Sequence, residues 1–166
     1  MKKYKKVVII VLALLFIIIV IYQNNYVSKY KKERFLENID AYNTLAEIYY
    51  EEYQKHSTRI LNYSIIEEGT IHCYDYNSDI KLSEEDTKIA QIALDAFKEG
   101  DIIYEICDVY VYDTFVSFCG GDGKESVIYS AKDNKPSYIA YPGADSKKPI
   151  IMKITEHWYY AVRNLL

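Results

Sequence analysis

A run of acidic and amide side chains between positions 75 and 86 is the pattern in this sequence closest to a metal-binding loop. Oxygen-bearing side chains occupy positions 1, 3, 5 and 12 of this stretch, at Asp75, Asn77, Asp79 and Asp86. Calcium loops of the EF-hand and dockerin-like kinds share this spacing, but they need glycine at position 6 for a sharp turn. Here that residue is Ile80, for which a positive φ is costly. We therefore assign no metal ligand and keep a calcium-responsive loop as an alternative.

Three cysteines, Cys73, Cys107 and Cys119, are too few for a disulfide scaffold and lack the C-x-x-C spacing of redox or zinc sites. If the strands that carry Cys107 and Cys119 are joined by a three-residue loop, the two cysteines lie directly opposite each other. A two-residue loop would pair Cys107 with Gly120 instead. The first register allows a cross-strand disulfide in an oxidising compartment, a hypothesis that we weigh against two buried thiols.

Two neighbouring pairs, His72-Cys73 and Glu156-His157, have residue types that occur in cysteine or metal mechanisms. No motif places a nucleophile beside a base, and neither H-E-x-x-H nor G-x-S-x-G occurs in the chain. We therefore assign no catalytic residue, no cofactor-binding residue and no cofactor. An enzyme would need a pocket that gathers His72, Cys73 and His157.

The glycine-rich stretch Gly120-Gly121-Asp122-Gly123-Lys124 is similar to a phosphate-binding loop at first sight. Phe118 stands where the Walker pattern has its first glycine, and Glu125 stands where it has Ser or Thr. The stretch is better explained as the connection of a β-hairpin.

Tyrosine occurs 19 times, and Trp158-Tyr159-Tyr160 is the densest aromatic cluster. Side chains alternate between the faces of a strand, so we expect Trp158 and Tyr160 on one face and Tyr159 on the other. Core packing is favoured over a partner or glycan surface, because large aromatic residues dominate protein cores.

The whole chain has 166 residues, a formal net charge of −4 and 50% hydrophobic residues. This length and composition predict one folded domain plus an appendage, rather than two domains or a disordered chain. The sequence has no positive stripe of the kind that phosphate backbones require, so we expect no binding to nucleic acid.

The appendage is the uncharged run VVIIVLALLFIIIVIY at residues 7–22, which follows four lysines within the first six positions. As a helix it would cover about 24 Å, at the lower limit for a hydrocarbon core of about 30 Å. No small-residue cleavage site follows, and the first cysteine is Cys73, so no lipid-modified cysteine follows either. We predict an uncleaved signal-anchor that contacts the lipid bilayer through residues 7–22, with a cleaved export signal as the alternative.

Basic residues flank both ends of the run, but the first lysines adjoin it directly, and large C-terminal domains are translocated largely regardless of charge. We therefore expect a single-pass protein of the cell membrane. Its predicted parts are a cytoplasmic tail at 1–6, a transmembrane segment at 7–22, a juxtamembrane linker at 23–34 and an extracytoplasmic domain at 35–166. Frequent residues with AT-rich codons, such as Ile, Tyr, Lys and Asn, are associated with an AT-rich genome, which we expect to be bacterial.

From Tyr30 to Tyr63 the chain has no Pro or Gly, and apolar or aromatic positions, with His56 among them, recur at alternating intervals of four and three. This spacing predicts one long helix over residues 30–63. Further apolar residues widen its stripe, which favours packing on the protein's own sheet over a homodimeric stalk.

A short strand-like stretch at 64–76 precedes a second helix, with Ser83 as its N-cap and Gly100 at its end. Further strands are expected at 102–111, 114–119, 126–130, 137–141, 149–154 and 157–162, separated by turn residues. The predicted fold class is α+β, with an antiparallel β-meander whose helices lie on one face.

This order of elements, from Tyr30 to Val162, resembles the cystatin-like and nuclear-transport-factor-2-like cone folds. Periplasmic domains of VirB8-type conjugation assembly proteins, which follow one N-terminal span, are included in this resemblance. It rests on element order and transfers no functional residue, since such folds serve as enzymes, binders and scaffolds alike. It implies a component of a conjugation or secretion-type membrane complex as one alternative.

The function we predict is a membrane-anchored module of the bacterial envelope that binds or positions a protein partner, or another copy of itself, and catalyses no reaction. The alternatives are an envelope enzyme and the calcium-responsive module described above.

Overall fold

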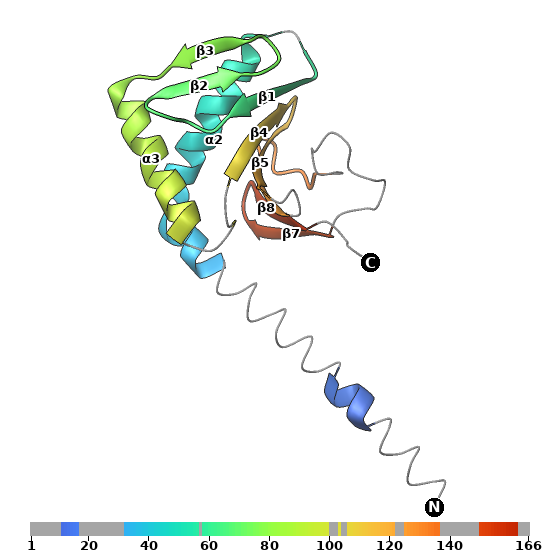
Figure 1. The fold of residues 1–166 in the computed structure, drawn as a ribbon. Helices are drawn as coiled ribbons and strands as arrows, with labels where there is room; N and C mark the ends of the chain where they lie inside the picture. Colours follow the sequence, from blue (N-terminus) through green and yellow to red (C-terminus); the bar gives the residue numbers. More distant parts are fainter. Residues whose placement is uncertain are drawn as a thin grey trace, which may run out of the picture.

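The elements of the domain are arranged as helices on one face of a single curved sheet (Figure 1). A computed structural model describes residues 11–16, 32–56, 58–99, 103, 106–121, 125–136 and 150–162. In chain order the labelled elements are α2 (Ile39–Gln54), β1 (Ile60–Ser64), β2 (Thr70–Cys73), β3 (Ser78–Lys81), α3 (Glu84–Glu99), β4 (Ile106–Tyr112), β5 (Phe115–Gly120), β6 (Glu125–Ser130), β7 (Ile150–Thr155) and β8 (Trp158–Val162). The predicted α+β class is confirmed.

The helix predicted over residues 30–63 is correct only in its first part. The described chain is helical at 32–37, turns at Asn38 and continues as α2. No apolar residue lies between Tyr53 and Ile60, so nothing there could hold another helical turn against the core. The chain therefore leaves the helix and enters β1.

In β1 the side chains follow the two-residue period of a strand rather than the helical stripe. Leu61 and Tyr63 are buried, whereas Ile60 is 36% exposed. Ile60 and Tyr63 therefore fit the helical spacing by coincidence. In the strand Tyr63 is buried, as a helix would also have required, but Ile60 is not.

Helix α3 begins as the sequence predicts. The Ser83 hydroxyl oxygen accepts a hydrogen bond from the Asp86 backbone N–H at 3.1 Å and donates to the Asp86 carboxylate at 2.6 Å. This pairing satisfies a backbone donor that the first turn of the helix would otherwise leave unpaired. Residues Ala90, Ala93 and Phe97 then face the core.

In the described part of the chain, the sheet has eight antiparallel strands in the order β3-β2-β1-β4-β5-β6-β8-β7. The predicted meander is wrong at one step, because β6 pairs with β8 and β7 lies at the edge. Nineteen residues, 131–149, separate β6 from β7 in the sequence, and of these the structure describes 131–136.

Two further strand predictions have different outcomes. The single stretch predicted at 64–76 divides into the end of β1, the strand β2 and a turn that leads to β3, which the sequence reading missed. The strand predicted at 137–141 lies outside the described residues.

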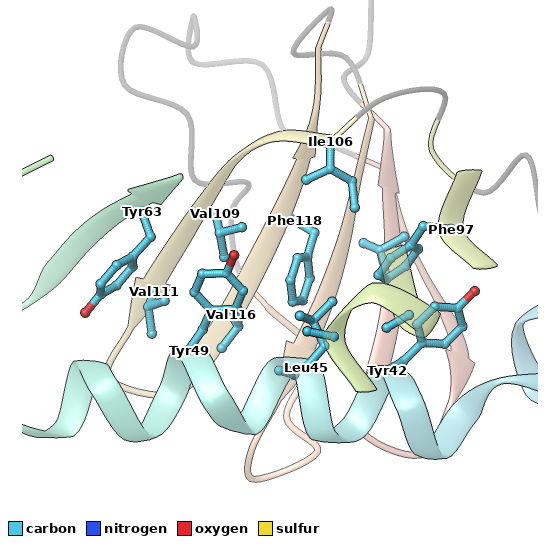
Figure 2. Packing of buried hydrophobic residues seen from close by; sticks show 14 of the residues in the cluster. Tyr42, Leu45, Tyr49, Tyr63, Phe97, Ile106, Val109, Val111, Val116 and Phe118 are labelled. Atoms are coloured by element: carbon cyan, nitrogen blue, oxygen red, sulfur yellow. The ribbon is translucent and has the colours of Figure 1, made fainter. Parts of the chain in front are cut away.

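The main core fills the space between the helices and the sheet (Figure 2). Tyr42, Leu45 and Tyr49 project from α2 toward the sheet, where Val116 and Phe118 of β5 meet them. The rings of Tyr49 and Phe118 pack edge to face with centroids 5.8 Å apart. Pairs of this kind stabilise a core beyond the area that they bury.

A second, smaller cluster lies on the opposite face of the sheet. Its buried members are Tyr110, Tyr112, Phe115, Cys119, Ile128, Tyr159 and Ala161. The strand register explains the division, because Tyr110, Ser117, Ile128 and Tyr159 oppose one another in a row across four strands. Trp158 and Tyr160 belong to the main core, so the predicted alternation of the aromatic triplet is confirmed.

Of the predicted membrane span at 7–22, residues 11–16 are described and form a helical segment, and the rest lies outside the described residues. Within the described ranges, no helix has the length and apolar character needed to cross a bilayer.

Candidate functional site

The hypothesis of a disulfide between Cys107 and Cys119 is wrong. The loop between β4 and β5 has two residues, so that Val111 lies opposite Val116 and Cys119 lies opposite Asp108. The register then shifts between Ile106 and Asp108, which places Cys107 in a β-bulge, exposed to solvent. The two sulfurs form no disulfide. One residue of loop length decided between the two registers.

The acidic stretch at 75–86 forms a hairpin turn, a strand and a helix start instead of a closed loop. Asp75 accepts a hydrogen bond from the Asn62 backbone N–H at 2.6 Å, Asp79 contacts His72, and Asp86 accepts a hydrogen bond from the Ser83 hydroxyl at the start of α3. Among the described residues, no group of three or more His, Cys, Asp or Glu is placed to hold a metal ion. The carboxylate oxygens of Asp75, Asp79 and Asp86 thus bind three separate groups of the protein.

The residues that an enzyme would have to gather are spread across the sheet. His72 and Cys73 lie in β2, whereas His157 lies in the turn between β7 and β8. Four strands separate β2 from β8, which corresponds to about 24 Å at the usual strand spacing. His157 is instead fixed locally, since its Nδ1 lies 2.8 Å from the Ser130 carbonyl oxygen.

The glycine-rich stretch lies at the end of β5, where Gly120 closes the strand and Gly121 begins the turn toward β6. Residues 122–124 are outside the described residues. The position agrees with a hairpin connection, as the sequence predicts.

Polar and aromatic side chains lie at the end of the sheet formed by the β2–β3 hairpin. We call them the hairpin surface: Tyr74, Tyr76 and Asp79, which are exposed, and His56 and His72, which are half-buried. His72 and Asp79 lie directly opposite each other on the two strands. The His72 Nδ1 is 2.8 Å from an Asp79 carboxylate oxygen, and the Tyr74 ring meets the imidazole edge to face at 5.1 Å. Tyr74 is 50% exposed.

The C-terminal end of α2 completes this surface. Just beyond α2, the His56 ring stacks on Tyr76 with centroids 4.5 Å apart, and Tyr76 is 49% exposed. Beneath it, the Tyr63 hydroxyl is buried and has no hydrogen-bond partner among the described residues, as is also true of the Asn62 side-chain oxygen. Burial raises the pKa of the Tyr63 hydroxyl above its usual range, so it stays a neutral donor.

The chemistry of the hairpin surface is that of recognition. His72 and Asp79 form a hydrogen-bonded pair, but the neighbouring Cys73 is wholly buried on the other face of β2. The thiol therefore cannot act with the imidazole as a nucleophile and base. The exposed tyrosine rings and half-buried histidine rings beside a carboxylate instead offer flat apolar faces and hydrogen-bonding groups.

A shallow hollow of about 510 Å³ lies at the other end of the same hairpin, where β3 leads into α3. It is lined by Glu68, Gly69, Thr70, Lys81, Leu82, Glu84, Thr87 and Lys88. Its lysines and glutamates carry both signs of charge, so it has no strong preference for anions or cations.

The sequence named Asp79 in a possible calcium loop and His72 in a possible enzyme site, but it did not predict that these side chains contact each other. The pairing of His72 with Asp79 depends on a tight turn at Tyr74–Asn77, where Asn77 has a positive φ of 47°. The polar Asp75-Tyr76-Asn77 stretch was the signal for this turn. Comparisons of the chain with protein-family profiles, with curated proteins and with solved structures give no match.

Proposed function

We propose that this protein is a membrane-anchored module of the bacterial envelope whose C-terminal domain lies outside the cytoplasm and binds or positions a protein partner. One observation carries the anchor. The large apolar side chains of Val11, Leu12, Leu14, Leu15 and Phe16 are between 49% and 68% exposed. Exposure of five neighbouring apolar side chains to water is unfavourable, and the hydrocarbon of a bilayer would remove them from water.

The packing of the domain supports a separation between an anchor at residues 7–22 and a partner-binding domain. Its two hydrophobic clusters, as far as the chain is described, are built from residues 35–161 and include none of residues 11–16. The described part of the run is thus available to a bilayer while the domain folds on its own core. The hairpin surface, with its exposed rings, is the part of the domain best suited to contact a partner.

Membrane fractionation tests the anchor. We expect the full chain to stay in the membrane pellet after a carbonate wash, and a variant that lacks residues 7–22 to be released. A matched variant, Leu12→Arg with Leu15→Arg, weakens the run at the described helical segment and is expected to shift a large part of the protein to the supernatant. Recovery of the full chain in the washed supernatant would contradict the proposal.

The exposed thiol of Cys107 tests the side of the membrane. A membrane-impermeant maleimide added to intact cells is expected to label the protein, and Cys107→Ser is expected to abolish the label, because the other two cysteines are buried. Labelling that appears only after the cells are opened would place the domain in the cytoplasm.

A further inference from the structure

Two of the three histidines of the chain lie on the hairpin surface, and each contacts a group that interacts more strongly with a charged imidazole than with a neutral one. The His72 Nδ1 lies 2.8 Å from a carboxylate oxygen of Asp79 on the neighbouring strand. A proton added to the imidazole turns this hydrogen bond into an ion pair, which is the stronger contact. Protonation of His72 therefore strengthens the connection between β2 and β3.

His56 makes the second contact of this kind. Its ring lies over the Tyr76 ring with centroids 4.5 Å apart and only 20° between the two planes. A cation over the face of an aromatic ring is attracted by the negative charge of that face. His56 also directly follows the C-cap residue of α2, where the last carbonyls of a helix favour a positive charge. Protonation of His56 therefore strengthens the connection between the end of α2 and the hairpin turn.

The charges around the two histidines do not oppose protonation. The charged residues of the elements that contact them are Glu51, Glu52, Lys55, Arg59, Asp75, Asp79 and Lys81. Four of these are acidic and three are basic, and the charge of Lys55, next to His56 in the chain, is paired with the Glu52 carboxylate. The uncharged rings that face the two histidines are those of Tyr74 and Tyr76. Added positive charge thus meets little repulsion here.

Such side-chain contacts matter because backbone pairing joins the β2–β3 hairpin only weakly to the sheet. In this part of the chain, which the structure describes, Tyr63 and Cys73 form the one regular pair between β1 and β2. The neighbouring His72 backbone N–H donates to the side-chain oxygen of Ser64, at 2.9 Å, rather than to a backbone carbonyl. Both strands of the hairpin have only four residues. Units with so few internal bonds open locally more often than the rest of a fold.

We propose that the hairpin surface is a pH-sensitive element, in which protonation of His56 and His72 fixes the β2–β3 hairpin to α2 and holds its two strands together. Histidine is the side chain whose charge ordinarily changes between about pH 5 and pH 8. At acid pH the exposed rings of Tyr74 and Tyr76 are held in place, and a partner then binds more tightly because less ordering is required. The inference concerns regulation of the surface assigned to the partner, and it rests on that proposed function.

Amide hydrogen exchange of the full chain, in micelles of an uncharged detergent, tests this element without a partner. Rates are measured at about pH 5.5 and about pH 8 and divided by the intrinsic rate at each pH, which gives a protection factor for each segment. We expect residues 70–81 to be about fivefold better protected at the lower pH, with each histidine contributing about twofold. Strand β5 is the internal reference, because its partners β4 and β6 contain no histidine, and it should change by less than about twofold.

Substitutions identify the groups that carry the response. His56→Gln combined with His72→Gln keeps polar side chains at both positions but should abolish the change in protection, because glutamine does not titrate. Asp79→Asn and Tyr76→Leu leave both histidines in place and remove one contact each. Each of these variants should therefore lose about half of the response on a logarithmic scale.

His157→Asn is the matched control. His157 lies in the turn between β7 and β8, four strands away from β2, and has a positive φ of 65° that asparagine tolerates. This variant should keep the full response of residues 70–81.

The inference is overturned if protection of residues 70–81 does not rise at the lower pH, or if it rises equally in the parent and in the double histidine variant. Loss of the response in His157→Asn would overturn it as well, since the titrating group would then lie at the other end of the sheet. The exchange measurement depends neither on membrane attachment nor on the side of the membrane. Failure of the fractionation or labelling tests is therefore told apart from failure of the pH response.

Discussion

The indole Nε1–H of Trp158 donates a hydrogen bond of 2.8 Å to the side-chain oxygen of Asn43, which joins β8 to α2 across 115 positions of the chain. Trp158 is wholly buried, and its ring packs against Phe35 and Phe118. The last strand is thereby fixed to the first labelled helix by both packing and a polar contact.

Loss of this contact is expected to destabilise the domain. Asn43→Ala leaves the indole N–H without its partner and should lower the free energy of unfolding by about 1–2 kcal/mol. A double-mutant cycle with Trp158→Phe in urea denaturation should give a coupling energy of about 1 kcal/mol. Thr44→Ala, which removes only a local bond to the Asp40 carbonyl, is the control and should change stability by less than about 0.5 kcal/mol.

A second prediction concerns pH. The Lys153 ammonium, together with the His157 backbone N–H, holds the pKa of the Asp133 carboxyl below its usual range. A carboxyl with a lowered pKa in the folded state contributes stability above its ordinary pKa, and this contribution is lost as the pH falls through the lowered value. Asp133→Asn should therefore reduce the urea midpoint at pH 7, and the difference from the parent should shrink steadily below about pH 4.

Asp95→Asn is a suitable control for this prediction, because Asp95 accepts a hydrogen bond from the neutral side chain of Gln91 on the same helix. A difference between Asp133→Asn and the parent that stayed constant from pH 7 to pH 2 would show that the contacts of the ionised carboxylate are not the cause.

A third prediction concerns Gly69, which has a positive φ of 75°. A Cβ atom built there would lie 2.9 Å from the Thr87 hydroxyl oxygen, at the start of α3. Gly69→Ala should therefore lower the free energy of unfolding by about 1–2 kcal/mol through backbone strain and this close approach. Thr87→Ser keeps the hydroxyl group that the new Cβ atom approaches, so it does not separate backbone strain from the close contact. Thr87→Gly removes the whole side chain, so combined with Gly69→Ala it should recover only the free energy lost through the close contact. Full recovery in that pair would show that the φ angle costs nothing.

Two local features were predicted correctly from the sequence, whereas features that depend on distant pairing were not. The cap at Ser83 and the alternation of Trp158, Tyr159 and Tyr160 follow from neighbours a few residues away. The start of β1 was not predicted, because Ile60 and Tyr63 also fit the helical spacing and β1 is held by pairing with β4, more than forty positions later. Whether a stretch stays helical is then settled by a partner that local periodicity does not reveal.

The hairpin surface shows the same limit. His72 and Asp79 are seven positions apart, and His56 and Tyr76 are twenty apart, yet each pair is in contact. The Cys107 and Cys119 register depended on whether the loop had two residues or three, and composition does not distinguish these lengths.

The cysteine register leads to the last prediction. Cys107 is exposed in its bulge, whereas Cys73 and Cys119 are buried, and the thiol of Cys119 lies 3.6 Å from the hydroxyls of both Ser117 and Ser126. Brief treatment of the native protein with N-ethylmaleimide should therefore add one group, at Cys107, and treatment after unfolding without reductant should add three. Mass mapping distinguishes the alternatives. An unfolded, unreduced protein that takes up one group at Cys73 alone would mean that Cys107 and Cys119 are bridged after all, and that the β4–β5 register is the three-residue one.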